Sequence, residues 1–297
     1  MKLSYWTLGM PFISAAEFAA KAVESGYQGV DLRCTRPDER GHPAGDGVLS
    51  IASADDEIDE IRSAFEAVGV EIPTLLCYRP RQPGGSSHTN QSADWGWLEE
   101  DVAAHAHLAE HVGASWIRIA VGAPGAESNW RSHLENLWLA TQCGVATTPG
   151  IGVLFENHPG SANAEQLLSM AEEVGDPRLR VLFSPDHTLV MQEDTLGLAR
   201  RYASQIGQVC FSDRRLVEED LARFDGQYYH VRYEVCWPGE GRVPASALLQ
   251  TLAQQGFDGY VALKWEHSSH QESALPSGEV ALPHFVNFIR GLEPIDS

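Results

Sequence analysis

Side chains able to move protons stand at the ends of three apolar runs in the second half of the chain. Glu156 ends the first run, and His158 follows it closely. His187 follows the second run, and Glu266 ends the third, two residues after Lys264. Carboxylates, imidazoles and amines act as acids and bases when burial and neighbouring charges adjust their pKa values. The pattern predicts acid–base chemistry, or a metal site built from the same side chains.

These runs belong to a regular alternation of strand-like and helical segments. The expected strands are 2–6, 28–33, 71–78, 115–122, 150–156, 180–184, 206–213 and 259–266. Helical periodicity is found at 14–26, 55–69, 97–113, 128–146, 164–175, 196–205, 244–256 and 284–292. Repeated strand–helix units in 297 residues predict an α/β protein, a closed (β/α)8 TIM barrel forming one domain over residues 1–297. Active sites of such barrels lie at the C-terminal ends of the strands.

The charge balance limits the classes of partner. The chain has 41 acidic and 21 basic residues, a formal net charge of -20 at pH 7. Nucleic acid and anionic membranes would be repelled, so we expect neither as a partner. We therefore expect a small-molecule substrate. A homo-oligomer is possible, because many soluble proteins form one.

The cysteines and the N-terminal segment indicate the compartment. The five cysteines are widely spaced and form no CxxC pair, which argues against a disulfide framework. The first residues, MKLSYWTLGMPF, do not resemble a signal peptide. No stretch of about 18 apolar residues suggests a membrane span. We expect a cytoplasmic protein.

Several motifs occur in a fixed order along the chain: LFENHPG (154–160), FSPDH (183–187), QVCFSDRR (208–215), PGEG (238–241) and KWEH (264–267). Together they resemble the xylose isomerase-like TIM barrel superfamily, which includes sugar phosphate isomerases and epimerases, inosose dehydratases and relatives of endonuclease IV. The resemblance covers essentially the whole chain. It implies the barrel fold but does not identify a substrate.

The resemblance also implies a divalent metal, held by Glu, Asp, His and Glu from strands five to eight. Glu156 and Glu266 match the first and last of these ligands. Ser184 stands where the family has aspartate, and Gln208 and Cys210 stand where the seventh strand has histidines. Because a serine hydroxyl is a poor ligand for such a cation, the ligand set is degraded and we expect no cofactor. The alternative is one divalent metal (Mn, Mg or Zn) bound by Glu156, Cys210 and Glu266.

Lys264 offers a replacement for the metal charge. It is one of three lysines in the chain, and strand alternation puts it on the inward face with Glu266. Its ammonium group would balance the buried glutamates, which would otherwise repel each other. The alternative is that Lys264 extends to the barrel floor and pairs with an unrelated carboxylate.

The expected catalytic residues are therefore Glu156, His187, Lys264 and Glu266. The glutamates would abstract and return a proton, and His187 would act as a general acid. Residues expected to bind substrate are Trp6, Arg118, His158, Cys210 and Arg215. Asp186 is shifted from the ligand position by two residues, and we expect it to point into the loop; the alternative is that a local bulge brings it back to the site.

This inventory suits an isomerase, epimerase or dehydratase that transfers a proton next to a carbonyl of a sugar-like or polyhydroxylated molecule, with or without metal. Two alternatives remain open, because a fold does not determine an activity. One is a diverged biosynthetic lyase or cyclase on the same barrel. The other is a non-catalytic protein that binds a small molecule.

Overall fold

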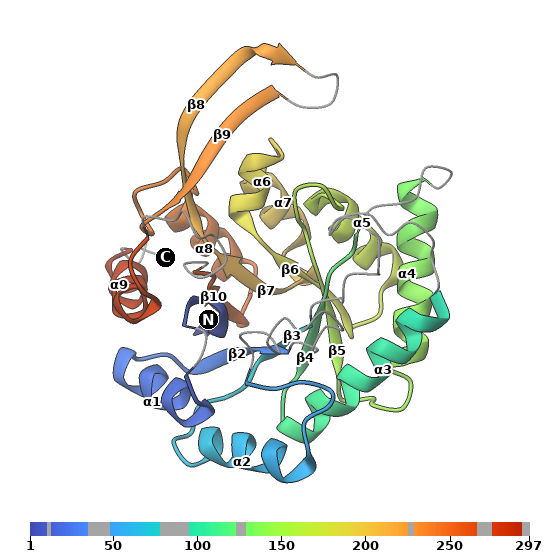
Figure 1. Cartoon of the computed structure of the whole chain (residues 1–297). Helices are drawn as coiled ribbons and strands as arrows, with labels where there is room; N and C mark the ends of the chain where they lie inside the picture. Colours follow the sequence, from blue (N-terminus) through green and yellow to red (C-terminus); the bar gives the residue numbers. More distant parts are fainter. Residues whose placement is uncertain are drawn as a thin grey trace.

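The computed structural model describes residues 1–10, 13–34, 48–77, 95–122, 129–224, 229–265 and 275–292. Within them, eight parallel strands close into a barrel in the order β1-β10-β7-β6-β5-β4-β3-β2 (Figure 1). The strands are β1 (Lys2–Trp6), β2 (Gly29–Cys34), β3 (Thr74–Cys77), β4 (Trp116–Ile119), β5 (Gly152–Glu156), β6 (Leu179–Phe183), β7 (Ile206–Phe211) and β10 (Tyr260–Leu263). The predicted (β/α)8 barrel is confirmed.

Helices lie around the outside of this ring of strands (Figure 1). They are α1 (Ala15–Ser25), α2 (Asp55–Glu66), α3 (Trp95–Val112), α4 (Trp130–Gly144), α5 (Ala164–Val174), α7 (Thr195–Tyr202), α8 (Ala245–Gln254) and α9 (Gly278–Gly291). Local sequence fixes their ends. In α1 the Ser14 side chain accepts a hydrogen bond from the Glu17 backbone, and the Glu17 carboxylate accepts one from the Ser14 backbone. Gly26 ends this helix at φ 86°, a left-handed conformation that glycine adopts without steric cost.

Strand alternation divides the apolar side chains between two clusters. Outward-facing residues pack under the helices and form the main core. Inward-facing residues fill the barrel; they are Trp6, Leu8, Leu76, Leu154, Leu182, Cys210 and Ala262. The barrel interior is therefore packed, and polar groups at its C-terminal end stand on a fixed apolar floor.

The segment 214–243 is not the plain connection that the sequence suggests. It contains most of an antiparallel pair, β8 (Asp213–Phe224) and β9 (Tyr229–Cys236), which projects from the barrel (Figure 1). The sequence pattern missed this pair because its strands are rich in charged residues and have no clear apolar alternation.

Asp213 ties the base of this projecting pair to the barrel. Its carboxylate accepts hydrogen bonds from the backbone N–H groups of Gly239 at 2.9 Å, Gly241 at 3.0 Å and Val243 at 3.1 Å. A Cβ at Gly241 would lie 2.0 Å from Asp213 Oδ1, so only glycine fits there. The motif PGEG thus has a structural role in this chain.

Three short helical segments complete the described chain: η1 (Thr7–Gly9), α6 (Pro185–Val190) and η2 (Ala203–Gln205). The first two follow strands β1 and β6 directly, at the C-terminal end of the barrel. The sequence pattern did not predict α6, because a helix of six residues is too short to show a periodicity.

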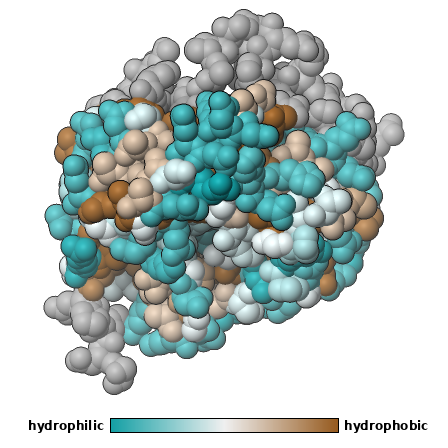
Figure 2. Space-filling view, turned by 90° about the horizontal axis from the view of Figure 1, so that it is seen from below, coloured by the Kyte–Doolittle hydropathy of each residue, from teal (hydrophilic) through white to brown (hydrophobic). Residues whose placement is uncertain are grey.

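The outer surface mixes hydrophilic and hydrophobic side chains. Figure 2 shows them interspersed on the face seen from below, with no broad hydrophobic area among the coloured residues. Single exposed apolar residues of this kind are normal for globular proteins. None of the described helices has the length and hydrophobicity needed to cross a lipid bilayer.

A polar cluster is buried inside the barrel between β1, β2, β3 and β7. Asp31 Oδ2 accepts hydrogen bonds from Ser4 Oγ at 2.7 Å and Gln208 Nε2 at 2.9 Å. Gln208 Oε1 in turn accepts a hydrogen bond from Thr74 Oγ1 at 2.5 Å. Burial raises the pKa of Asp31 to about 7, because an ionised carboxylate is poorly solvated there.

We predict that Asp31 makes the stability of the protein depend on pH. The folded state binds this proton more tightly than the unfolded state, so stability is lost as the pH rises from about 4 to about 7. Between pH 5.5 and pH 8, Asp31→Asn should lose about 2 kcal/mol less of its free energy of unfolding than the wild type, measured by urea unfolding. Asp258→Asn, an exposed site, is the control. An unchanged pH dependence in Asp31→Asn would contradict the prediction.

Candidate functional site

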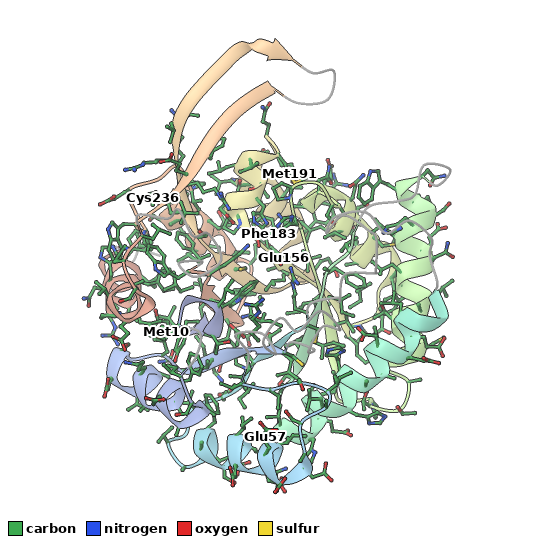
Figure 3. The ribbon with its side chains drawn as sticks, viewed as in Figure 1. Met10, Glu57, Glu156, Phe183, Met191 and Cys236 are labelled. Atoms are coloured by element: carbon green, nitrogen blue, oxygen red, sulfur yellow. The ribbon has the colours of Figure 1, made fainter. Side chains whose placement is uncertain are left out.

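Three of the predicted catalytic residues meet at the C-terminal end of the barrel. Glu156 is the last residue of β5, His187 lies in α6 after β6, and Lys264 directly follows β10. Their exposed fractions are 1%, 2% and 3%. Glu156 lies near the middle of the ring of strands (Figure 3). Glu266, the fourth predicted residue, lies outside the described residues.

Glu156 is surrounded by hydrogen-bond donors. Its Oε2 accepts from Arg118 Nε at 2.8 Å and from a second nitrogen of the same guanidinium group, Nη2. Its Oε1 accepts from Ser184 Oγ at 3.1 Å and from Lys264 Nζ at 3.4 Å. Burial alone would raise the pKa of Glu156, but the positive charges of Arg118 and Lys264 hold that pKa well below its usual range. The carboxylate is permanently ionised at neutral pH.

Lys264 lies inside the barrel mouth, as expected, and does not extend to the floor. Besides Glu156, its Nζ is 3.3 Å from His187 Nε2 and 5.4 Å from the centre of the Trp6 ring. The aromatic face attracts the ammonium charge. The amine thus lies between a carboxylate, an imidazole and an indole.

The tautomer of His187 follows from its hydrogen bonds. His187 Nδ1 is 2.7 Å from the carbonyl oxygen of Asn157, which can only accept, so Nδ1 carries the hydrogen. Burial lowers the pKa of His187 to about 4, and the ring is neutral at physiological pH. Its Nε2 therefore presents a lone pair to Lys264 Nζ.

Asn157 and Ser184 position these groups. The Asn157 amide accepts a hydrogen bond from Ser184 N at 2.8 Å and donates one to Ser184 O at 3.0 Å, which joins the ends of β5 and β6. Ser184 is the N-cap residue of α6, yet its hydroxyl does not cap the helix and bonds Glu156 instead. Sequence reasoning missed Asn157; its only signal was its place beside Glu156.

Asp186 differs from the expectation that it points into the loop. It is fully buried, and its Oδ2 accepts a hydrogen bond from Arg214 Nε at 2.7 Å. The same oxygen is 3.6 Å from His187 Nε2. The reason is that the chain enters helix α6 at Pro185, so Asp186 turns inward beside His187. Arg214, at the base of β8, is a site neighbour that the sequence did not indicate.

Of the five predicted substrate-binding residues, Arg118 and Trp6 contact the cluster, as described above. The His158 ring is 4.6 Å from the His187 ring, and burial lowers the pKa of His158. Cys210 is buried in the apolar floor, and burial raises the pKa of its thiol well above the usual range. Arg215 is not brought to the site: its side chain is 59% exposed and lies 3.7 Å from Glu234 on the projecting strands.

The aromatic residues Trp237 and Trp265 pack against each other, with ring centres 5.2 Å apart. The indole N–H of Trp265 donates to Pro276 O at 2.9 Å. These contacts give Trp265 a packing role.

The described residues do not fit a divalent cation. No group of three or more His, Cys, Asp or Glu side chains within the described ranges is arranged to hold one. Glu156 is instead bonded to two cationic side chains, and Cys210 is a neutral thiol in an apolar cluster. A metal at Glu156 would have to displace the Lys264 ammonium group, which carries the same sign of charge.

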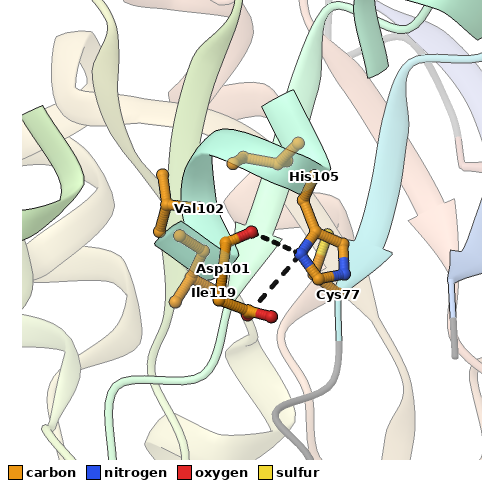
Figure 4. A pocket seen from close by; sticks show the side chains of 6 residues that line it. Cys77, Asp101, Val102, His105 and Ile119 are labelled. Atoms are coloured by element: carbon orange, nitrogen blue, oxygen red, sulfur yellow. Dashed lines mark hydrogen bonds and ion pairs between the residues drawn. The ribbon is translucent and has the colours of Figure 1, made fainter. Parts of the chain in front are cut away.

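A second polar group lies outside the barrel wall, between α3 and strands β3 and β4. Figure 4 shows this small pocket, lined by Cys77, Asp101, Val102, His105, Ile117 and Ile119. His105 Nδ1 donates to the carbonyl oxygen of Asp101 at 2.7 Å and lies 3.5 Å from its carboxylate. The two residues are one helical turn apart on α3, and their hydrogen bond satisfies the buried imidazole. We therefore assign this pair a structural role.

Comparison with known proteins agrees with this architecture. The sequence profile of the family described as xylose isomerase-like TIM barrel matches residues 19–282. A candidate hydroxypyruvate isomerase of Streptomyces coelicolor is 26% identical over 246 residues, which is 75% of this chain and 80% of that protein. An inosose dehydratase of Lacticaseibacillus casei is 23% identical over 126 residues, 39% of this chain and 41% of that enzyme.

Solved structures extend the likeness to the whole fold. An L-ribulose 3-epimerase superposes with a TM-score of 0.72 at 14% identity, over 97% of this chain and 93% of that one. At this identity the likeness concerns the arrangement of the chain alone.

We predict that Arg118 stabilises the fold through Glu156. Arg118→Met should lower the free energy of unfolding by about 3–5 kcal/mol, because it leaves a buried carboxylate with one cation fewer. The double variant Arg118→Met/Glu156→Gln should recover part of this loss, as measured in urea. The control is Arg131→Met, whose exposed ion pairs should contribute less than about 1 kcal/mol. Equal effects at Arg118 and Arg131 would contradict the prediction.

Proposed function

Because the chain belongs to the xylose isomerase-like TIM barrel family, we propose that it is an isomerase, epimerase or dehydratase acting on a small hydroxy-carbonyl compound. The named substrates of its relatives, hydroxypyruvate, inosose and L-ribulose, all carry a ketone beside a hydroxyl-bearing carbon. Their reactions share one step, the removal of a proton from the carbon next to the carbonyl.

One observation carries the proposal: Lys264 Nζ lies 3.4 Å from Glu156 Oε1 and 3.3 Å from His187 Nε2 at the C-terminal end of the barrel. A cation held there polarises a substrate carbonyl, which makes the adjacent C–H more acidic. The fixed lone pair on His187 Nε2 supports a role as proton acceptor more than the general-acid role expected from the sequence. Glu156, ionised and held by Arg118, fixes the position of the amine.

The proposed mechanism uses no metal ion. Two cationic side chains, Arg118 and Lys264, already contact the carboxylate that a metal would need. Electrostatic stabilisation of the enediolate is then the task of these side chains. Glu266 keeps its predicted role as a second acid or base.

We predict that substrate turnover depends on His187 and Lys264. The assay incubates the protein with hydroxypyruvate, an inosose or L-ribulose in D2O and follows loss of the proton signal next to the carbonyl by NMR. His187→Gln and Lys264→Met should each slow exchange by about 100-fold or more. Arg131→Met, on the outer surface, should leave it unchanged. Exchange at wild-type rate in both site variants would refute the assignment.

We further predict that activity survives removal of divalent metal. Protein purified without a chelator should contain Mn and Zn well below one ion per chain, and proton exchange should persist after treatment with EDTA. Added Mn²⁺, Mg²⁺ or Zn²⁺ should leave the melting temperature unchanged, because an ion that binds the folded state would raise it. A stoichiometric, tightly held metal would overturn the metal-free mechanism.

A further inference from the structure

Lys264 is a buried amine with an imidazole nitrogen, His187 Nε2, at 3.3 Å from its Nζ. We propose that Lys264 forms a covalent imine with the carbonyl carbon of the substrate, and that this imine withdraws electrons during proton transfer. The inference rests on the proposed function for its class of substrate and adds a covalent intermediate to it. Lysines buried in protein interiors serve as Schiff-base residues when a neighbouring group can accept their proton.

A proton acceptor is in place beside the amine. His187 Nε2 lies 3.3 Å from Lys264 Nζ, and the bond from Nδ1 to the Asn157 carbonyl leaves Nε2 with its lone pair free to accept. The Asp186 carboxylate, 3.6 Å from Nε2, faces the imidazolium that this proton transfer forms.

The site can also stabilise the positive charge of a protonated imine. Glu156 Oε1 faces Nζ at 3.4 Å, while its other oxygen binds Arg118. The Trp6 ring lies 5.4 Å from Nζ and attracts a cation at this distance. A protonated imine carries the same charge as the ammonium group, so it keeps both contacts.

The step balances without an oxidant or a metal. Lys264 passes a proton to His187 Nε2, and its lone pair attacks the carbonyl carbon, whose π electrons move to oxygen. The oxygen leaves as water with protons returned through His187, so an ammonium group and a ketone give a protonated imine and water. His187 Nε2, neutral again after this return, takes the adjacent C–H proton, and the electrons of that bond form a neutral enamine. Reprotonation of the same carbon restores the imine, with inverted configuration when the proton returns to the opposite face, and addition of water to this imine releases the epimer and the amine.

Two buried polar atoms on residues of this cluster lack partners within the described part of the chain: Trp6 Nε1 and Asp186 Oδ1. Buried polar groups in native proteins are nearly always hydrogen-bonded, so such atoms indicate a missing ligand or water. One is a donor, and the other is an acceptor. A hydroxyl group both donates and accepts, so the pair suits a carbonyl compound that also carries hydroxyls.

The test traps the imine by reduction. The full-length protein is incubated with dihydroxyacetone or hydroxypyruvate and sodium cyanoborohydride, and labelled lysines are identified by peptide mass spectrometry. Lys264 should gain the mass of one probe molecule minus one oxygen atom well before Lys21, the partly exposed lysine paired with Glu279. His187→Gln should slow this labelling by about 100-fold. Lys21→Arg, the matched control, should leave it unchanged.

The variant Lys264→Arg separates covalent from electrostatic roles, because it keeps the positive charge without a nucleophilic amine. The imine predicts loss of proton exchange by about 100-fold or more in this variant. Labelling of Lys264 no faster than Lys21, or near wild-type exchange in Lys264→Arg, would overturn the imine. If the wild type exchanges the substrate proton but Lys264 is not labelled, the imine is refuted and the proposed function still stands. If the wild type shows neither proton exchange nor labelling of Lys264, the imine and the proposed function are both refuted.

Discussion

The arrangement at the barrel mouth depends on one buried negative charge. Glu156 is almost completely excluded from water, and an unpaired carboxylate at such a depth costs several kcal/mol. Arg118 and Lys264 offset that cost, with Ser184 completing the hydrogen bonds. The three charged side chains depend on one another, because removing any one of them leaves a buried charge with less compensation.

The same constraint relates the barrel to its chemistry. Strand ends place Arg118, Glu156 and Lys264 on a packed floor of apolar side chains, so these groups cannot relax away from one another. Asn157 joins two neighbouring strand ends and also orients His187. In the proposed mechanism, side-chain cations thus take the task of the divalent ion that the family resemblance implies. In that account an amine takes the place of the ion.

The repeated strand–helix pattern made the fold predictable, because each β/α unit carries its own signature of apolar spacing and helix ends. The meeting of Glu156, His187 and Lys264 was predictable too, since the fold brings strand ends together. Asp186 was misplaced because a one-turn helix, invisible in the sequence, reverses the direction of its side chain. Asn157 and Arg214 were missed because their roles are hydrogen bonds to particular atoms. The pair β8 and β9 was missed because projecting strands need no apolar face.

Glu266, which the sequence places beside the site, is a residue whose part in the reaction remains a prediction. Its neighbour Lys264 is the residue on which the mechanism depends. A crystal structure of the protein grown or soaked with Mn²⁺ tests that dependence most directly. The account predicts Lys264 Nζ within hydrogen-bonding distance of both Glu156 and His187, with no ion between them. Manganese bound to Glu156, with Lys264 turned out of the cluster, would contradict it.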